Sequence, residues 1–360
     1  MDLLAAWIRR FRRARPDTNR VEPAGYPPLA REDAPIASAI KQAQRTRQST
    51  AADPAGAEPG PGPAHRVSGP LDGNIDRRFT AFLFGVGSPV AAKAGAAERR
   101  VIVQIEQVVA HNRGPNLVPR LPVELPRLIS LVRRDDVSPR DLSERLMRDP
   151  TLVGEVVRLA NSPRYRTGRD IADLQEAVIA LGQSGLTQLV VSAAMRPIFD
   201  ARQGRFGRIA GTRVWDVTER CSHACVHLSG DAINPFHAYL AGMVANIGMI
   251  GALRVLDTDY SDHQPPRTEE FHDCLRQAAA KLSVQIARQW DFPSTVCRAV
   301  HQFGAGPPGT ADDDLTRVLR TADRIAKCHV LSPGLAGAAL AGLDDRERRC
   351  YAELERAFGR

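Results

Sequence analysis

The sequence predicts an all-α protein, a helical bundle of two packed helical subdomains that follow a disordered N-terminal tail. The 360 residues are 43% apolar but only 5% aromatic, so aliphatic side chains must do most of the packing, as is usual in helical bundles. From about residue 97 onward, apolar residues recur at helical spacing, and no segment has the convincing pattern of a strand. The short loops between these helical segments favour a bundle over an α/β sheet.

The first 76 residues divide into two segments of different character. Residues 1–15 are predicted to form a basic amphipathic helix, with Trp7 and Phe11 on an apolar face opposite a face of arginines. Residues 16–76 are rich in Pro and Gly and hold too few apolar side chains to offset the entropy of ordering, so they are predicted to be a disordered linker. The expected contacts of the helix are an anionic membrane surface, a partner protein or the chain's own core. The residues expected to make them are Trp7, Arg9, Arg10, Phe11, Arg12 and Arg13.

The charge of the chain argues against nucleic-acid binding. The net charge is +8. Residues 1–20 contain six Arg and two Asp, which is +4, so the other 340 residues carry only +4. A protein that grips a phosphate backbone over a whole face needs a larger excess. We therefore expect no nucleic-acid partner.

Cysteine usage and hydropathy indicate a cytoplasmic protein. The six cysteines form no CxxC pair and are expected to be reduced core residues. In "CSHACVH", Cys221 and Cys225 share one helix face while His223 and His227 lie nearly opposite, which favours packing over a metal site. No membrane-spanning helix is expected, so the N-terminal helix is the only expected route to membrane association.

Three further segments follow the linker. Residues 77–119 are expected to hold an apolar island, "RRFTAFLFGV", and a leading helix. Residues 120–212 are expected to form the first helical subdomain, in which Asp149 caps a helix that starts at Pro150 and Gly182 ends another. Residues 213–360 are expected to form the second subdomain, with helices over 213–229, 235–256, 268–289, 293–303, 312–331 and 344–357.

The first subdomain resembles the HDOD domain, the HD-related output domain of bacterial signalling proteins, and the resemblance extends over roughly residues 120–330. The residues that carry it are Leu125-Pro126, Leu142, Asp149-Pro150, Leu152, Leu159-Ala160-Asn161-Ser162, Ile171, Ala177-Val178 and Leu181-Gly182. Within this pattern Asp149, Asn161 and Ser162 are candidates for a partner or ligand surface. The alternative, which the chemistry of Asx side chains favours, is that they satisfy local backbone groups.

The second subdomain resembles the HD phosphohydrolase superfamily, whose His … His-Asp … Asp pattern holds a catalytic metal. The resemblance places Val217 at the first histidine and Ala245-Asn246 at the His-Asp pair. Only His301 and Asp323 match ligand positions. Alanine has no donor atom and a neutral amide is a weak ligand, so we expect no metal, no cofactor and no catalysis. His301 and Asp323 are expected to pair with each other or to cap a helix.

The resemblance implies a non-catalytic signal-transduction output module that binds unidentified regulatory proteins. Two alternatives stay open. One is a metal-dependent phosphohydrolase with a rearranged site that uses His301, Asp323 and His237. The other is a sensor of a small ligand such as a nucleotide. The missing His-Asp pair argues against the first alternative.

Overall fold

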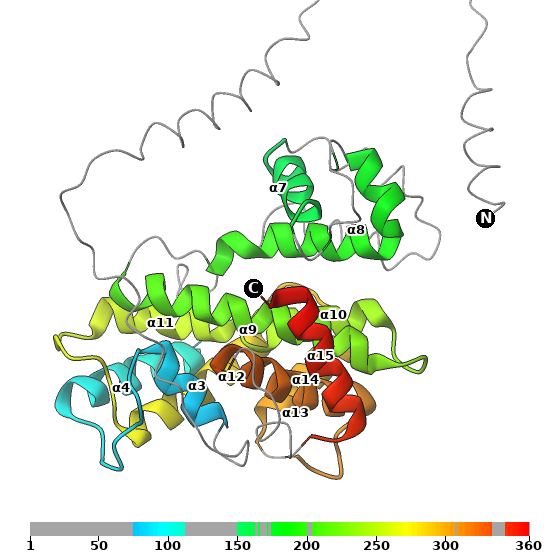
Figure 1. Cartoon of the computed structure of the whole chain (residues 1–360). Coiled ribbons are helices and arrows are strands. Elements are labelled where there is room, and N and C mark those ends of the chain that lie inside the picture. The colour runs from blue at the N-terminus through cyan, green and yellow to red at the C-terminus, as the bar shows by residue number, and fades with distance from the viewer. Residues whose placement is uncertain are drawn as a thin grey trace, which may run out of the picture. The chain divides into compact units, whose positions relative to one another are not determined.

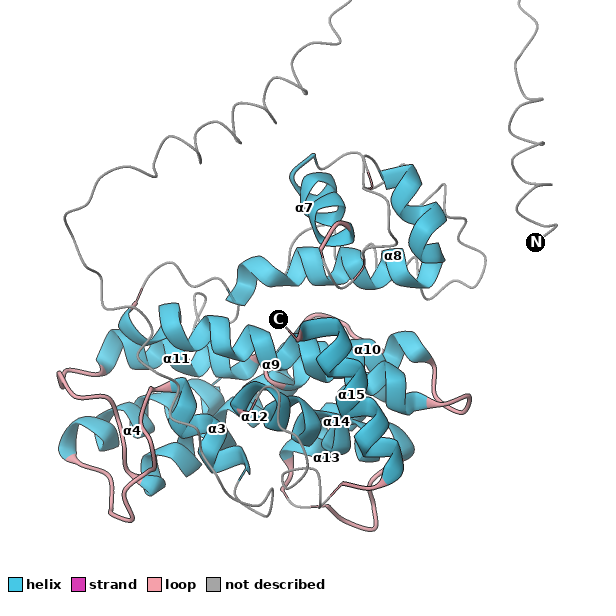
Figure 2. Ribbon diagram, in the orientation of Figure 1, coloured by secondary structure: helices cyan, strands magenta, loops and turns pink. Residues whose placement is uncertain are grey.

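The computed structural model describes residues 75–111, 150–162, 165, 171, 174–199, 204–306, 308–332 and 343–359. Within these residues the chain is helical, apart from loops and one isolated bridge between Val90 and Thr268, which confirms the all-α prediction (Figure 2). Residues 1–74 and 112–149 lie outside the described residues, and with them the predicted helix at 1–15, nearly all of the predicted linker, and Asp149.

The helices follow one another in two groups along the chain (Figure 1). The helices before residue 200 are α3 (Ile75–Leu83), α4 (Ala96–His111), α7 (Pro150–Ala160) and α8 (Leu174–Phe199). Those after it are α9 (Arg205–Ser229), α10 (Pro235–Ala245), α11 (Gly248–Asp259), α12 (Glu269–Gln289), α13 (Ser294–Gly304), α14 (Asp314–Leu331) and α15 (Asp345–Phe358).

Helix α9 is the central helix of the bundle. It contacts α3, α8, α10, α11, α14 and α15. Helix α9 is also the element on which the sequence prediction placed a domain boundary, between residues 212 and 213. Helix α9 runs unbroken across that position, so the helix expected over 213–229 begins earlier, at Arg205.

Helices α3 and α4 belong with the second group of helices. Helix α3 packs on α9, α12 and α14, and α4 packs on α11 and α12. The predicted linker was expected to extend to residue 76, but α3 already begins at Ile75, so its last two residues are helical. The start of α3 could not be predicted from composition, because these two residues directly follow a Pro- and Gly-rich stretch.

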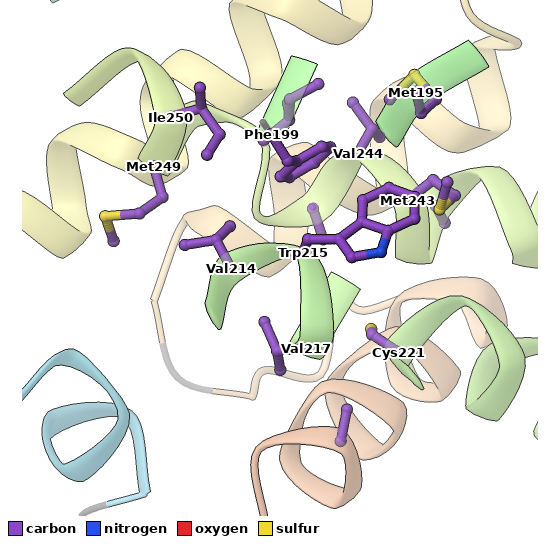
Figure 3. Close-up of a cluster of buried hydrophobic side chains, with 14 of the residues drawn as sticks. Met195, Phe199, Val214, Trp215, Val217, Cys221, Met243, Val244, Met249 and Ile250 are labelled. Atoms are coloured by element: carbon purple, nitrogen blue, oxygen red, sulfur yellow. The ribbon is translucent and has the colours of Figure 1, made fainter. Parts of the chain in front are cut away.

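The core is aliphatic with a few large rings, as the composition indicates. Figure 3 shows side chains of α8, α9, α10 and α11 gathered around Trp215, including Phe199, Met243 and Val244. Trp215 is 4% exposed and meets Phe199 edge-on at 5.2 Å between ring centroids. Contacts of this kind tie α8 to α9 and α10.

The predicted helix over 235–256 is two helices. Helix α10 ends at Ala245, Asn246 is its C-cap at φ −104° and ψ 4°, and α11 starts at Gly248. The buried Ser283 of α12 bridges the break: its hydroxyl donates to the carbonyl of Ala245 at 2.8 Å and accepts from the N–H of Gly248 at 2.9 Å. Apolar periodicity could not reveal the break, since both halves are buried almost completely.

This stretch is also the one that passes a length and composition test for a membrane span. Residues Pro235–Asp259 have a mean hydropathy of 1.5 in their most apolar window, and 89% of that window is buried inside the protein. A buried core helix of a globular protein satisfies the same test. Here the apolar side chains face the other helices of the bundle.

Other helix ends follow the sequence signals. Gly182 has φ 69° and ψ 177°, which confirms the predicted stop, although a second helical segment follows it directly and both count as α8. Side chains of Asn234, Thr268, Asp313 and Asp344 accept hydrogen bonds from backbone N–H groups of the first turns of α10, α12, α14 and α15. Such caps satisfy donors that the helix itself leaves unpaired.

We predict that Gly248→Ala destabilises the protein by about 1–3 kcal/mol, the usual cost of overpacking. A β-carbon at Gly248 would lie 2.0 Å from the carbonyl oxygen of Ala279 and 2.5 Å from the backbone nitrogen of Ser283, so α11 and α12 would have to separate. Urea denaturation measures the change in the free energy of unfolding.

Gly154→Ala in α7 is the matched control for this substitution. A β-carbon there meets nothing within 4 Å, and alanine favours a helix interior by about 1 kcal/mol over glycine. An equal loss of stability in both variants would contradict the close approach of α11 to α12.

Candidate functional site

The structure brings together two of the residues that the resemblance places at metal-ligand positions. Asn246, at the end of α10, donates from Nδ2 to Oδ1 of Asp323 on α14 at 2.9 Å. Asp323 is 4% exposed, so its carboxylate needs partners inside the protein. The break between α10 and α11 positions Asn246 for this contact, because it turns the chain at that residue.

A lysine provides the second partner of Asp323. Lys327 lies one turn later on α14, and its Nζ is 2.5 Å from Oδ2 of Asp323 and 2.7 Å from Oδ1 of Asp76 on α3. Lys327 is 5% exposed, and its ammonium lies 5.7 Å from the centroid of the Phe79 ring. We call Asp76, Asn246, Asp323 and Lys327 the buried network.

The charges of the buried network hold it in one protonation state. Burial by itself would lower the pKa of Lys327, but the carboxylates of Asp323 and Asp76 outweigh burial and raise its pKa above the usual value. The positive charge of Lys327 lowers the pKa of Asp76. Burial raises the pKa of Asp323, against the attraction of Lys327. An ammonium between two carboxylates is therefore the state that this surrounding favours.

An arginine of α12 extends the buried network to the surface. Arg276 of α12 lies 3.6 Å from the second oxygen of Asp76 and also pairs with Asp273 on its own helix at 2.8 Å. Around the start of α3, three carboxylates thus pair with two cations: Asp76, Asp273 and Asp323 with Lys327 and Arg276. The balance of charge explains how these acidic residues can lie this close together.

The residues of the buried network do not fit a divalent metal. Both oxygens of Asp323 already accept hydrogen bonds, from Asn246 and from Lys327. Asn246 turns its NH₂ group, a donor, toward the carboxylate, and Ala245 offers no ligand atom. The Lys327 ammonium would repel a cation at this place. Within the described residues no group of three His, Cys, Asp or Glu side chains is placed to hold a metal ion.

The remaining positions of the former metal pattern lie apart from this network. His301 is exposed on α13, so the predicted pairing of His301 with Asp323 is wrong. His237 lies in the first turn of α10 and contacts the hydroxyl of Thr295 at 3.0 Å. Eight residues of helix separate it from Ala245, about 12 Å along the axis. Val217 is fully buried in the core on α9.

The "CSHACVH" stretch of α9 has the arrangement that the sequence predicts. Cys221 and Cys225 are free thiols and fully buried. His223 lies on another face, where its ring meets Tyr239 and Tyr165, and His227 is exposed. The hydrogen bond with Cys225, burial and the nearby Asp323 raise the pKa of Cys221, so its thiol stays protonated. These cysteines act as core residues beside the buried network.

Asn161, a candidate for a partner or ligand surface, makes local hydrogen bonds. Its Nδ2 donates to the carbonyls of Val157 at 3.1 Å and of Ile171 at 2.7 Å, and its Oδ1 accepts from the N–H of Ile171 at 2.7 Å. Ser162 is half-buried, and its carbonyl accepts from the N–H of Tyr165. The Asn161 side chain thus holds the turn after α7, whereas its part in binding a partner stays a prediction.

Two members of the buried network were not predicted from the sequence. Lys327 had a signal, because Asp323 and Lys327 are four residues apart on a predicted helix and share one face. Asp76 had none, since it lies at the end of a segment that reads as linker. The link between residues 76 and 327 is a tertiary contact that no local pattern encodes.

Comparisons with known proteins agree with the fold. A family model of the HDOD domain matches residues 118–303. A protein of Geobacter sulfurreducens, described as an HDOD domain protein with unknown function, shares 17% identity and a TM-score of 0.51, over 72% of this chain and 89% of its own. A "putative metal-dependent phosphohydrolase" from Shewanella amazonensis SB2B shares 18% identity and a TM-score of 0.53, over 73% of this chain and 99% of its own.

An uncharacterized protein of Treponema pallidum (strain Nichols) is 22% identical over 193 residues. The match spans 51% of this chain but only 37% of that relative's length. At these identities the two structural likenesses show the shared fold.

We predict that Lys327→Met lowers the free energy of unfolding by about 3–5 kcal/mol, the usual cost of breaking a buried ion pair on one side. The loss shrinks as the pH falls from 7 to 5. Without the ammonium, burial raises the pKa of Asp323 further, so the folded variant takes up a proton more readily than the unfolded chain, and folding gains stability as the pH falls. Urea denaturation at both pH values measures this.

Arg317→Met on the same helix is the matched control. Arg317 pairs with Asp314, but the two side chains are 61% and 69% exposed, so the expected loss is below about 1 kcal/mol and changes little with pH. The buried network as described is contradicted if Lys327→Met costs no more than the control.

Proposed function

Because this chain belongs to the HDOD family, we propose that it is a non-catalytic signal-transduction output module that acts by binding a partner protein. The observation that carries the proposal is the position of Lys327. Its ammonium lies between Asp323 and Asp76, beside the two residues, Ala245 and Asn246, that replace the metal-binding His-Asp pair. A fixed cation of the protein itself thus lies beside the positions that the resemblance assigns to metal ligands, and this supports the proposal.

Metal-dependent phosphoester hydrolysis needs groups that this site does not offer. A metal must be held by several anionic or imidazole ligands, and it must lower the pKa of a bound water so that hydroxide can attack. Here Asp323 is the one carboxylate of the pattern, and its oxygens are taken by Asn246 and Lys327. A lysine with a raised pKa is also a poor general base, because it keeps its proton.

The alternative of a rearranged hydrolase site finds no support in the geometry. His301 is exposed on α13 and His237 contacts Thr295 at the far end of α10 from Ala245. The three residues of that alternative, with Asp323 buried on α14, therefore do not converge. Binding of a partner protein requires a complementary helical surface and does not require these three side chains to lie together.

Turnover assays test the non-catalytic part of the proposal. Purified full-length chain is incubated with Mn²⁺ or Mg²⁺ and, in turn, cyclic dinucleotides and (p)ppGpp, and the products are separated by chromatography. The expected result is no metal-dependent product, and no saturable binding of Mn²⁺ by calorimetry. Asp323→Asn is the diagnostic variant, and Asp345→Asn at the exposed start of α15 is its control.

Two outcomes would contradict the proposal. Product that requires Mn²⁺ and is lost in Asp323→Asn but kept in Asp345→Asn would show that the chain is a hydrolase. Recovery of no stoichiometric protein partner on affinity capture from the native host would contradict the binding role.

A further inference from the structure

Charged contacts hold the first turn of α3 against the bundle. Asp76 pairs with Lys327 at 2.7 Å. Its neighbour Arg77 reaches in the other direction, to Asp273 of α12 at 2.9 Å and to Glu269 at 3.4 Å. Thus α3 offers one negative and one positive group, and the groove between α12 and α14 offers the opposite charge to each of them.

The rest of α3 fills this groove with apolar side chains and a capped end. Phe79 is 4% exposed and lies under the Lys327 ammonium, and Leu83 is 1% exposed. At the C-terminus of α3, the guanidinium of Arg213 on α9 donates to the carbonyls of Phe82 and Leu83. The guanidinium thereby binds backbone carbonyls that any helix end would present.

The chain that follows α3 is fixed to the bundle independently of α3. Gly85 turns the chain at φ 69°, and Val90 then exchanges backbone hydrogen bonds with residues 267 and 269 at 2.7 and 3.0 Å. The N–H of Ala94 donates to the carboxylate of Glu270. Because these contacts hold the loop and α4 in place, α3 can leave the groove without removing α4.

Helix α3 is a short occupant of a groove that other helices build. It has nine residues, and an isolated helix of that length is marginal in water. It also lies upstream of residues 118–303, which the family model matches, whereas the groove helices α9 and α12 lie within them. Two of the three groove helices thus lie within the family match, whereas α3 and α14, which carries Lys327, lie outside it.

From these contacts we propose that the groove formed by α9, α12 and α14 is a protein-interaction site that α3 occupies in cis. Its partner is an amphipathic helix of another protein that displaces α3. This inference rests on the proposed function of partner binding and names the surface involved.

The contacts of α3 define the chemistry of that partner helix. It presents a carboxylate to Lys327 and Arg276, as Asp76 does. It carries a basic residue next in sequence for Asp273, and an aromatic residue three positions after the carboxylate, as Phe79 follows Asp76. An aliphatic residue at the position of Leu83 completes one face of a two-turn helix. The partner helix makes the same kinds of contact with the groove that α3 makes. Small differences in affinity between the two helices therefore decide which one is bound.

A peptide of residues 75–83, capped at both ends and labelled with a fluorophore, serves as the probe of the groove. It is titrated against the full-length wild-type chain and against Asp76→Ala/Arg77→Ala, which loosens α3 but keeps Phe79 and Leu83. Fluorescence anisotropy measures binding, and hydrogen exchange measures protection of α3. Glu155→Ala/Arg158→Ala, which removes the ion pair of α7 away from the groove, is the matched control.

We expect the peptide to bind the Asp76→Ala/Arg77→Ala chain at least tenfold more tightly than the wild-type or control chains. Exchange in residues 75–83 rises in that variant, while α10 and α13 stay protected. A peptide that carries Asp76→Ala binds at least tenfold more weakly, because it lacks the carboxylate for Lys327.

Three results would overturn the inference. In the first, the peptide does not bind although α3 has lost protection from exchange. In the second, α3 keeps its wild-type protection in the variant. In the third, protection falls throughout the bundle, so that α3 proves to be a structural part of the core. None of these results involves turnover, so a failure here is distinguishable from a hydrolase activity that would refute the proposed function.

Discussion

The ammonium of Lys327 between the carboxylates of Asp323 and Asp76 is the interaction on which the arrangement of this bundle depends. It neutralises the buried carboxylate of Asp323 and the partly exposed carboxylate of Asp76, which would otherwise repel each other. It also links α14 to α3, and through Asn246 the same network reaches the break between α10 and α11. Lys327 and its partners thus connect α3, α14 and the end of α10.

Most of the packing of this bundle does not involve the positions that the resemblance assigns to metal ligands. The surroundings of Trp215 and the close approach of α10 to α9 at Gly242 are packing features that require no ion. The residues that the resemblance places at metal-ligand positions also contribute to packing. Val217 fills the core. Ala245 ends α10, and the Ser283 hydroxyl donates a hydrogen bond to its carbonyl. The function that we propose accordingly depends on contacts at the surface of the bundle.

Much of the fold could be predicted from the sequence, because periodicity and capping residues act locally. Gly182 breaks its helix as predicted, and Asp313 and Asp344 cap helices close to the predicted starts. The break at Asn246 was missed, because both helices are buried on every side and their apolar run continues without interruption. The site was predicted only in part: Asp323 and Asn246 were identified, but their link to Lys327 and Asp76 depends on tertiary contacts.

The most direct measurement of the central claim is the titration of the lysine side chains by NMR. The chain has only four lysines, so the Nζ signals of a ¹⁵N-lysine-labelled sample can be followed individually from pH 8 to pH 11. One signal, absent in Lys327→Met, should keep the chemical shift of a protonated ammonium throughout, beyond the pKa of about 10.4 that a free lysine has. If all four signals titrate together, Lys327 is not held between Asp323 and Asp76.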